Sequence, residues 1–421
     1  MKAYERFLNY VMVNTKADGE SSSIPSSSGQ KEFAQRLFEE LSDLGVKDLI
    51  LTEQGYLYGK IPSNLPPEEP QPLTVGFIAH LDTAPNLDSP HVRPKLIQPY
   101  QGEVIPLENG LVHDPSQDPC LQAALGAGII ITDGTTLLGG DDKAGVAEIV
   151  TMVEYVMTHP DYHHGPIAFA FTPDEEIGGS CKNFDINRFG ADAAYTVDGE
   201  GFGTLEYENF CSGAAVVTIQ GVMTHPGYAK NLMKNALVIG TEFHQMLPAW
   251  ERPEHTEGYE GFQHLAEFNG DCGACTLGYL IRDFDAAGYE QRQARFQRIA
   301  DYLNRQYGEG TVQLERIDVN QNMASRLQET PYVIEFAKES IAACGVEPQV
   351  TPIRGGTDGV KLTFMGVPCP NLGTGSYHHH SALEFANIRE MDQCVELMLR
   401  LGTRFASTQC SDRENKPYGS M

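Results

Sequence analysis

Short and nearly continuous apolar runs recur along the first two hundred residues. They span residues 73–79, 167–171 and 193–197. Runs of this kind are typical of strands that are buried on both faces, as in a parallel sheet. Between the first two runs, Val146, Ile149, Val150 and Val153 follow the i, i+3, i+4, i+7 spacing of one buried helix face. The pattern predicts an α/β fold, in which helices flank a mixed, mostly parallel sheet.

The pattern changes after residue 209. Strands are expected at residues 214–220, 262–268, 274–281 and 312–319, with helices at residues 232–246 and 289–307. This β-α-β-β-α-β order is that of a ferredoxin-like unit, which can fold as a lid of its own. From residue 325 on, the chain again shows the alternation of helices and short strands that is seen before residue 209. We therefore expect one discontinuous catalytic domain, residues 1–209 and 325–421, with an inserted lid domain at residues 210–324.

The connection between the first apolar run and the helix at residue 146 is the least regular part of the pattern. Residues 83–128 are rich in proline and predict no clear element. Residues 129–138 hold Asp133-Gly134 between two apolar stretches, which is typical of a β-hairpin. The last residues, from about residue 407, are expected to form a frayed polar tail.

Composition and charge narrow the function classes. The 421 residues carry a formal net charge of -27, which argues against nucleic acid or an anionic membrane surface as a partner. The N-terminus lacks the apolar core of a signal peptide, and no stretch reaches transmembrane length. Nine cysteines, an odd and scattered set, predict reduced thiols in a cytoplasmic protein. The CxxC at residues 272–275 has no second pair and is interpreted as structural.

Acidic and histidine residues follow the predicted buried strands. His80 and Asp82 end the first run, residues 174–176 (Asp-Glu-Glu) follow the second, and Asp198 follows the third. Open α/β sheets place their ligands at the carboxyl ends of the strands. A fourth acidic group, Asp141-Asp142, stands at the start of the helix that contains Val146. Taken alone, it fits an ordinary acidic N-terminal cap, because Asp is common there.

Together these residues predict a dinuclear metal site. The candidate ligands are His80, Asp141, Glu176, Asp198 and one histidine of residues 378–380. Imidazole and carboxylate ligands suit two Zn²⁺ ions, with Co²⁺ or Mn²⁺ as alternatives. A shared aspartate fits two metals about 3.5–4 Å apart, which lower the pKa of a bridging water that acts as the nucleophile. Glu175 is then the expected general base.

Other polar residues near this group have milder roles in the prediction. Asp82 is expected behind His80, where it would bind the second ring nitrogen. Asp142 is interpreted as setting the turn, and Lys143 as balancing local negative charge.

Long motifs carry a resemblance to a known family. They include Phe171-Thr172-Pro173-Asp174-Glu175-Glu176, His225-Pro226-Gly227 and residues 5–11, 132–139, 195–199, 281–285 and 352–359. Over nearly its whole length the chain resembles the peptidase T family, the tripeptide aminopeptidases of the dizinc aminoacylase/carboxypeptidase clan. The resemblance implies a zinc-peptidase fold with a dimerisation lid, and hence a homodimer.

The resemblance also implies roles for individual residues. It implies His80, Asp141, Glu176, Asp198 and His380 as zinc ligands, with Asp141 bridging. It implies Asp82 and Glu175 as the catalytic pair, and a cis peptide bond between Asp141 and Asp142. The family has His-Gly at the last ligand, whereas this chain has His380-Ser381. The family spacing back from Glu384 selects His380, and His378 and His379 remain alternatives.

The implied substrate is a short peptide, from which the N-terminal residue is removed. A guanidinium fork suits the free carboxylate of such a peptide, so Arg282 and Arg354 are candidates, with His225 of the lid. A structural ion pair is the alternative for each arginine. Two rival functions stay open: a related dizinc hydrolase for dipeptides or N-acyl amino acids, and a non-catalytic, metal-stabilised peptide-binding protein. Glu175 argues against the second, because a binding site needs no base.

Overall fold

The computed structural model describes residues 1–66, 72–87 and 91–408, and the chain forms two compact units. Unit 1 comprises Met1–Tyr207, Arg326–Thr351 and Thr357–Met421, and unit 2 comprises Glu208–Ser325 and Pro352–Gly356. The expected lid domain, residues 210–324, begins and ends within two residues of the main segment of unit 2, Glu208–Ser325. The short segment 352–356 is a difference, since we placed it in the catalytic domain. It joins unit 2 because the backbone N–H of Ile353 donates to the carbonyl of Glu208 at 2.8 Å. The expected polar tail lies outside the described residues from residue 409 on.

Unit 1 is built on an eight-stranded mixed sheet. Its spatial order is β1 (Asp48–Leu51), β2 (Leu57–Ile61), β8 (Ile167–Thr172), β3 (Val75–His80), β9 (Ala193–Gly199), β16 (Asn371–Gly373), β10 (Thr204–Glu206) and β15 (Gln349–Val350). The pairs β8–β3, β3–β9, β9–β16 and β10–β15 are parallel, and the others are antiparallel. The predicted α/β class with a mixed sheet is confirmed.

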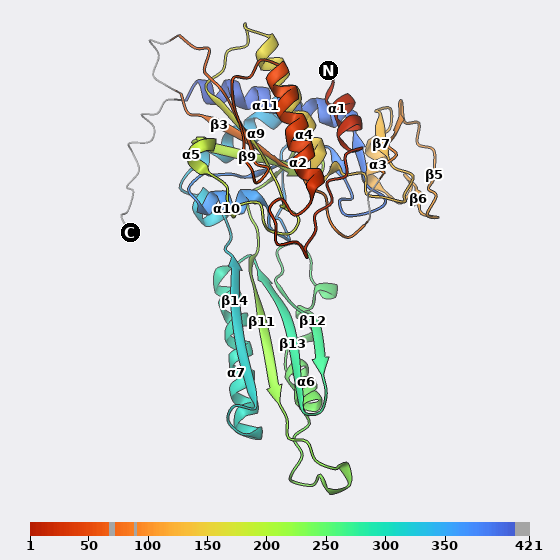
Figure 1. Cartoon of the computed structure of the whole chain (residues 1–421), viewed down its shortest axis with the longest axis vertical. Helices are drawn as coiled ribbons and strands as arrows, with labels where there is room; N and C mark the ends of the chain where they lie inside the picture. Colours follow the sequence, from red (N-terminus) through yellow and green to blue (C-terminus); the bar gives the residue numbers. More distant parts are fainter. Residues whose placement is uncertain (67–71, 88–90, 409–421) are drawn as a thin grey trace. The chain divides into compact units, whose positions relative to one another are not determined.

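The central strands are apolar throughout because both faces of the sheet are covered. In β8, Ile167, Phe169 and Phe171 enter the main core, while Ala168 and Ala170 enter a second core on the other face. The main core also takes residues of α1 (Ala3–Tyr10), α2 (Ser28–Asp43), α4 (Gly140–Thr158), α9 (Pro331–Ala343) and α11 (Ile388–Ala406). The second core involves α5 (Ile186–Phe189) and α10 (Asp358–Phe364). Figure 1 labels these helices.

The irregular connection before α4 contributes to two small sheets. One has the order β17 (Ser376–Tyr377), β18 (Phe385–Asn387), β7 (Ile129–Ile131) and β4 (Lys95–Ile97), and the other pairs β5 (Ile105–Pro106) with β6 (Val112–His113). A short helix, α3 (Pro119–Ala123), lies between β6 and β7 in the sequence.

The predicted hairpin at residues 129–138 is wrong. β7 pairs with β4 and β18, and residues 135–138 form no strand. The local turn does form, since Asp133 accepts a hydrogen bond from the backbone N–H of Thr135 at 2.9 Å. The backbone N–H of Leu138, however, donates to the carboxylate of Glu384 at 2.8 Å rather than to a partner strand.

Unit 2 has the predicted β-α-β-β-α-β order. It consists of β11 (Cys211–Gln220), α6 (Ala236–Gln245), β12 (Phe262–Gly270), β13 (Ala274–Asp283), α7 (Ala286–Tyr307) and β14 (Val312–Asn320), with three short 3-10 turns, η1 (Pro226–Tyr228), η2 (Ala249–Glu251) and η3 (Pro253–His255). The antiparallel sheet has the order β12-β13-β11-β14. Alternate residues of β11, such as Val217, share one hydrophobic core with Phe243 of α6 and Phe296 of α7. The helix α8 (Ala324–Leu327) follows.

Among the described residues, no helix is both long enough and apolar enough to cross a membrane. The eight cysteines in the same part of the chain are free thiols, including Cys272 and Cys275 of the CxxC.

Candidate active site and metal centre

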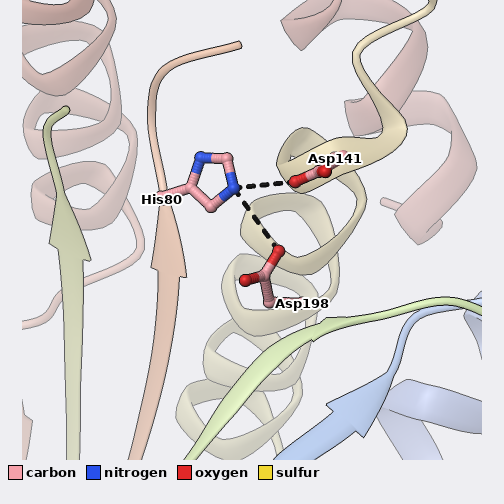
Figure 2. Close-up of side chains that lie close together, drawn as sticks. All are labelled: His80, Asp141 and Asp198. Carbon is pink, nitrogen blue, oxygen red and sulfur yellow. Dashed lines mark hydrogen bonds and ion pairs between the residues drawn. The ribbon is translucent and has the colours of Figure 1, made fainter. Parts of the chain in front are cut away.

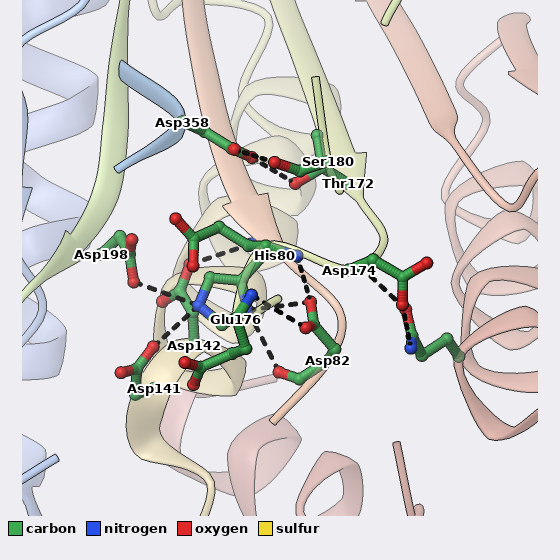
Figure 3. A network of polar contacts seen from close by, with 12 residues as sticks. His80, Asp82, Asp141, Asp142, Thr172, Asp174, Glu176, Ser180, Asp198 and Asp358 are labelled. Atoms are coloured by element: carbon green, nitrogen blue, oxygen red, sulfur yellow. Dashed lines mark hydrogen bonds and ion pairs between the residues drawn. The ribbon is translucent and has the colours of Figure 1, made fainter. Parts of the chain in front are cut away.

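Three parallel strands end at one edge of the large sheet. The strands β8, β3 and β9 are neighbours that run in the same direction, so their carboxyl ends meet there. His80 is the last residue of β3, Asp198 lies near the end of β9, and Glu176 lies in the turn after β8. Figure 3 shows these side chains close to one another. All five candidate metal ligands belong to unit 1.

One group of possible ligands gathers around the ring of His80. Its Nε2 lies 2.7 Å from Oδ1 of Asp141 and 3.4 Å from Oδ1 of Asp198 (Figure 2). Asp141 comes from the first turn of α4, so the group joins a helix end to two strand ends. These three side chains offer ligand atoms within 4.8 Å of one another, which is close enough to hold one metal ion.

A second group shares Asp141 with the first. Nε2 of His380 lies 3.1 Å from the other Asp141 oxygen, Oδ2, and 2.9 Å from Oε2 of Glu176. Ligand atoms of these three residues also lie within 4.8 Å of one another. One oxygen of Asp141 therefore faces each group, which is the arrangement that a carboxylate bridging two metal ions requires.

The three consecutive histidines differ in their nearest partners. Nε2 of His378 lies 2.7 Å from Oδ2 of Asp118, which also caps α3. Nε2 of His379 lies 2.7 Å from the hydroxyl of Ser376, and its Nδ1 is 3.5 Å from Asp141. His380 alone of the three belongs to a ligand group among the described residues.

The residues present fit two divalent cations. The donor set of imidazole nitrogens and carboxylate oxygens suits zinc. Oε1 of Glu176 is buried and has no hydrogen-bond partner within the described residues, so one ligand atom is left without a proton donor. Burial raises the pKa of Asp198 to about 7, and hydrogen bonds to Asp141 and Glu176 raise the pKa of His380 to about 10. A buried carboxylate is stabilised by a nearby positive charge, and a bound metal ion would supply it.

The start of α4 combines the two roles that the sequence left open. Asp141 and Asp142 have non-helical backbone angles, and the peptide bond between them is cis, as the resemblance implied. Asp142 does cap the helix, because its Oδ1 accepts a hydrogen bond from the N–H of Gly145 at 3.1 Å. Gly139 precedes this turn at φ +83°, which favours glycine.

Among the described residues, the buried Lys143 forms no ion pair with a carboxylate. Its Nζ donates to the backbone carbonyl of Val13 at 2.7 Å, and burial lowers its pKa to about 7. This hydrogen bond links α4 to the N-terminal segment, and the nearby negative charges of Glu384 and Asp82 oppose the lowering of the pKa, in keeping with the expected balance of local negative charge.

Asp82 lies behind His80, although its nearest contact with the ring is through the backbone. The carbonyl oxygen of Asp82 lies 3.1 Å from Nδ1 of His80, and its carboxylate Oδ1 lies 3.4 Å away. The two carboxylate oxygens accept hydrogen bonds from the backbone N–H groups of Glu175, at 3.0 Å, and Glu176, at 3.1 Å. Asp82 thus connects the His80 strand to the turn that carries the expected base.

Sequence reasoning missed the role of Asp358. This buried residue accepts hydrogen bonds from the hydroxyl groups of Thr172, at 2.8 Å, and Ser180 (Figure 3). Thr172 ends β8, and Ser180 follows the turn with Glu175 and Glu176. Asp358 therefore links the two ends of that turn through hydrogen bonds. Burial raises the pKa of Glu175 well above its usual value, and the negative charge of Asp358 adds to the effect. The only signal in the sequence was the position of Asp358 inside the motif at residues 352–359.

The three candidate substrate-binding residues belong to unit 2. The guanidinium of Arg282 donates to the backbone carbonyls of Gly213 and Ile281, both at 2.9 Å. That of Arg354 donates to the carbonyls of Gly258, at 2.6 Å, and Glu260, at 3.1 Å. His225 is exposed and accepts a hydrogen bond from the N–H of Gly227 at 3.1 Å. Their roles toward a substrate remain predictions.

Comparison with known proteins places the chain in a family. The profile of peptidase family M20/M25/M40 matches residues 137–404. A protein named Peptidase T from Clostridium perfringens is 46% identical over 400 residues, covering 95% of this chain and 98% of its own. Two solved structures share the fold at 20% identity and cover 96% of this chain and 98% of their own: aminopeptidase PepT from Bacillus cereus, with a TM-score of 0.74, and a tripeptidase from Staphylococcus aureus, with a TM-score of 0.73.

The match to the family profile covers more than half of the chain, and the identity to the relative extends over nearly its full length. Both agree with the resemblance that the motifs carry. The chain belongs to peptidase family M20/M25/M40 and, within it, to the peptidases of the Peptidase T family.

Proposed function

We propose that the protein is a zinc-dependent tripeptide aminopeptidase, which hydrolyses the peptide bond after the N-terminal residue of its substrate. The observation that carries the proposal is the sharing of Asp141 between two ligand groups, with Glu175 next to a member of the second. The names of the relatives support a peptidase, and the resemblance to tripeptide aminopeptidases supports the substrate class.

The five ligands divide naturally between two ions. His80, Asp141 and Asp198 would hold one, and Asp141, Glu176 and His380 the other. Two bound zinc ions would supply Lewis-acid polarisation of the substrate carbonyl and a water of lowered pKa. The chain itself supplies the geometry, because Asp82 and Asp142 fix the backbone of the ligand-bearing segments.

Glu175 would move the proton. Its carboxylate takes the proton of the attacking water and delivers it to the leaving amine. A carboxylate whose pKa is raised by burial is a stronger base than an exposed one, which favours taking the proton from water. Asp82 would keep Glu175 in place through the hydrogen bond to its backbone N–H.

The substrate carboxylate requires cationic partners, which we propose to be Arg282 and Arg354, with His225 as a further donor. A guanidinium binds a carboxylate through two parallel hydrogen bonds. Homodimerisation through unit 2 and a cytoplasmic location stay predictions from the sequence and the family resemblance.

The test is release of free amino acids from di-, tri- and tetrapeptides and from N-acyl amino acids, before and after chelation and zinc restoration. We expect cleavage that is confined to tripeptides, abolished by the chelator and restored by zinc. Zinc-restored cleavage of acylated amino acids would keep the metal centre and overturn the substrate. A protein that binds zinc but cleaves nothing would favour the peptide-binding alternative.

A further inference from the structure

Buried carboxylates around the site bind the backbone of the segments that carry the ligands. Asp82 follows His80 by two residues and accepts the N–H groups of Glu175 and Glu176. Asp142 follows Asp141 directly, and its Oδ2 accepts the N–H of His80 at 3.1 Å (Figure 3). In both cases, a carboxylate from one ligand segment fixes the backbone of the next.

Glu384 makes the largest set of such contacts. It follows His380 by four residues and is 2% exposed. Its Oε2 accepts the N–H groups of Leu138 and Gly139, both at 2.8 Å, and its Oε1 accepts the N–H of Asp141 at 3.1 Å. Glu384 therefore links the His380 segment to Asp141. Asp142 in turn links the Asp141 segment to His80, and Asp82 links the His80 segment to Glu176. We call Asp82, Asp142 and Glu384 the carboxylate series.

We propose that Glu384 is a positioning residue of the metal centre. It holds the turn at residues 138–141 so that the two oxygens of Asp141 face the two ligand groups. Glu384 acts through Asp141 and contacts neither ligand atom nor substrate in this role. The inference rests on the proposed metal centre and adds to it a residue that the motifs used only for spacing.

The negative charge of Glu384 is the property that matters. Three N–H groups converge on one carboxylate, and hydrogen bonds to a charged acceptor are stronger than those to a neutral one. Leu138 and Gly139 lie outside any strand, so Glu384 takes the place of a partner strand for their N–H groups. A turn fixed in this way presents Asp141 without rearrangement when a metal ion binds.

The glycine at residue 140 provides independent support. A Cβ added there would lie 2.9 Å from Oε1 of Glu384 and 2.9 Å from Cβ of Ser376. Side-chain atoms do not tolerate so close a contact, so residue 140 has to be glycine for Glu384 to approach the turn. The absence of a side chain at Gly140 thus allows the carboxylate of Glu384 to reach the backbone N–H groups of the turn.

The variant Glu384→Gln keeps the volume and one acceptor but presents an NH₂ group to backbone N–H donors. If Glu384 positions Asp141, the variant binds zinc about 10- to 100-fold more weakly, as is typical when a partner of a ligand is lost. Its kcat at saturating zinc falls, while KM for a tripeptide stays near the wild-type value. A role confined to folding would lower the unfolding midpoint and leave zinc affinity unchanged.

The experiment measures the zinc dissociation constant of the full chain by competition with a chromophoric chelator. Wild type, Glu384→Gln and the control Glu148→Gln are compared, together with their thermal unfolding. Glu148 is another buried glutamate of unit 1, on α4, and its carboxylate binds no ligand segment among the described residues. We expect weaker zinc binding in Glu384→Gln alone. Equal affinity in all three proteins would overturn the inference.

A second variant keeps the inference testable if Glu384→Gln does not fold. Gly140→Ala leaves the carboxylate intact and pushes it away from the turn, and we expect the same loss of zinc affinity. Unchanged affinity in a folded Gly140→Ala protein would count against the inference. Failure of the proposed metal centre would look different, because wild type itself would then not bind two zinc ions, and failure of the substrate assignment would change the cleavage test but not the zinc affinities.

Discussion

Gln30 and Asp174 are joined by two hydrogen bonds. The backbone N–H of Asp174 donates to Oε1 of Gln30 at 3.0 Å, and Nε2 of Gln30 donates to Oδ1 of Asp174 at 2.8 Å. The two residues are 0% and 1% exposed. Asp174 immediately precedes Glu175 and Glu176, so the first turn of α2 fixes the start of the acidic segment that follows β8.

Gln30→Leu is expected to destabilise the protein and reduce zinc-dependent turnover. The substitution removes both hydrogen bonds and leaves the buried N–H of Asp174 without its acceptor, which costs about 1–3 kcal/mol. Urea unfolding measures the loss. Gln35→Leu on the same helix is the matched control, because Gln35 is exposed and bonds only to Glu39 among the described residues. Equal effects of the two variants would contradict a specific role for the Gln30–Asp174 pair.

Glu175→Gln is expected to retain folding and zinc while losing most turnover. The amide keeps the size of the side chain, but it cannot accept the proton of the attacking water, and proton transfer of this kind contributes about 100- to 10,000-fold to the rate. Metal content and kcat are measured on the same preparation. Glu176→Gln provides the contrast, since it should lose zinc as well as activity. Near-normal kcat in Glu175→Gln would show that another group is the base.

Much of the fold and of the site was predictable because the chemistry stands next to regular elements. The apolar run before His80 predicts a buried strand, and the runs before Glu176 and Asp198 predict its neighbours. Parallel strands bring their carboxyl ends together, so these residues had to meet. The alternation of elements after residue 209 likewise predicts unit 2, whose order is confirmed.

The remainder depends on contacts between distant residues, which no local pattern contains. The hairpin expected at residues 129–138 failed because Glu384, far along the chain, binds the N–H of Leu138. Residues 352–356 lie in unit 2 because Ile353 bonds to Glu208, although the sequence around them resembles the other domain. The partners of His378 and His379, which are Asp118 and Ser376, could not be predicted either, since a single Asp or Ser in a loop predicts nothing by itself.

Arg354 has two interpretations that one substitution separates. Its guanidinium donates to the carbonyls of Gly258 and Glu260 and lies 5.1 Å from the ring centroid of Phe210. If it also binds the substrate carboxylate, Arg354→Lys raises KM for a tripeptide about tenfold, because lysine cannot make the bidentate contact. The C-terminal amide of the same tripeptide is the control substrate and should show no change in KM.

A purely structural Arg354 gives a different result. Arg354→Lys would then lower the midpoint of thermal unfolding and change KM for the tripeptide and its amide alike. Arg282 is tested with the same two substrates. Its two backbone acceptors, Gly213 and Ile281, lie in strands of its own sheet, so Arg282→Lys is also expected to lower stability by about 1 kcal/mol.

Glu148 makes stability depend on pH in a predictable direction. It is 0% exposed, and neither carboxylate oxygen has a hydrogen-bond partner among the described residues. The nearby thiol of Cys394 donates to the carbonyl of Gly373 at 3.1 Å. Burial raises the pKa of Glu148 well above the usual value of 4.5. Between that value and the raised pKa, the folded protein binds more protons at Glu148 than the unfolded chain does.

The contribution of Glu148 to the free energy of unfolding therefore falls as pH rises above 4.5, by up to about 1.4 kcal/mol per pH unit. Glu148→Gln has a side chain of the same size that does not titrate, so this loss is absent. We expect the variant and wild type to unfold at similar urea concentrations near pH 4.5, and the variant to become the more stable protein as pH rises toward 8. Urea unfolding of both proteins across this range, at the same zinc concentration, measures the difference. A difference that stays constant with pH would mean that Glu148 is charged in the folded protein and that its charge is compensated.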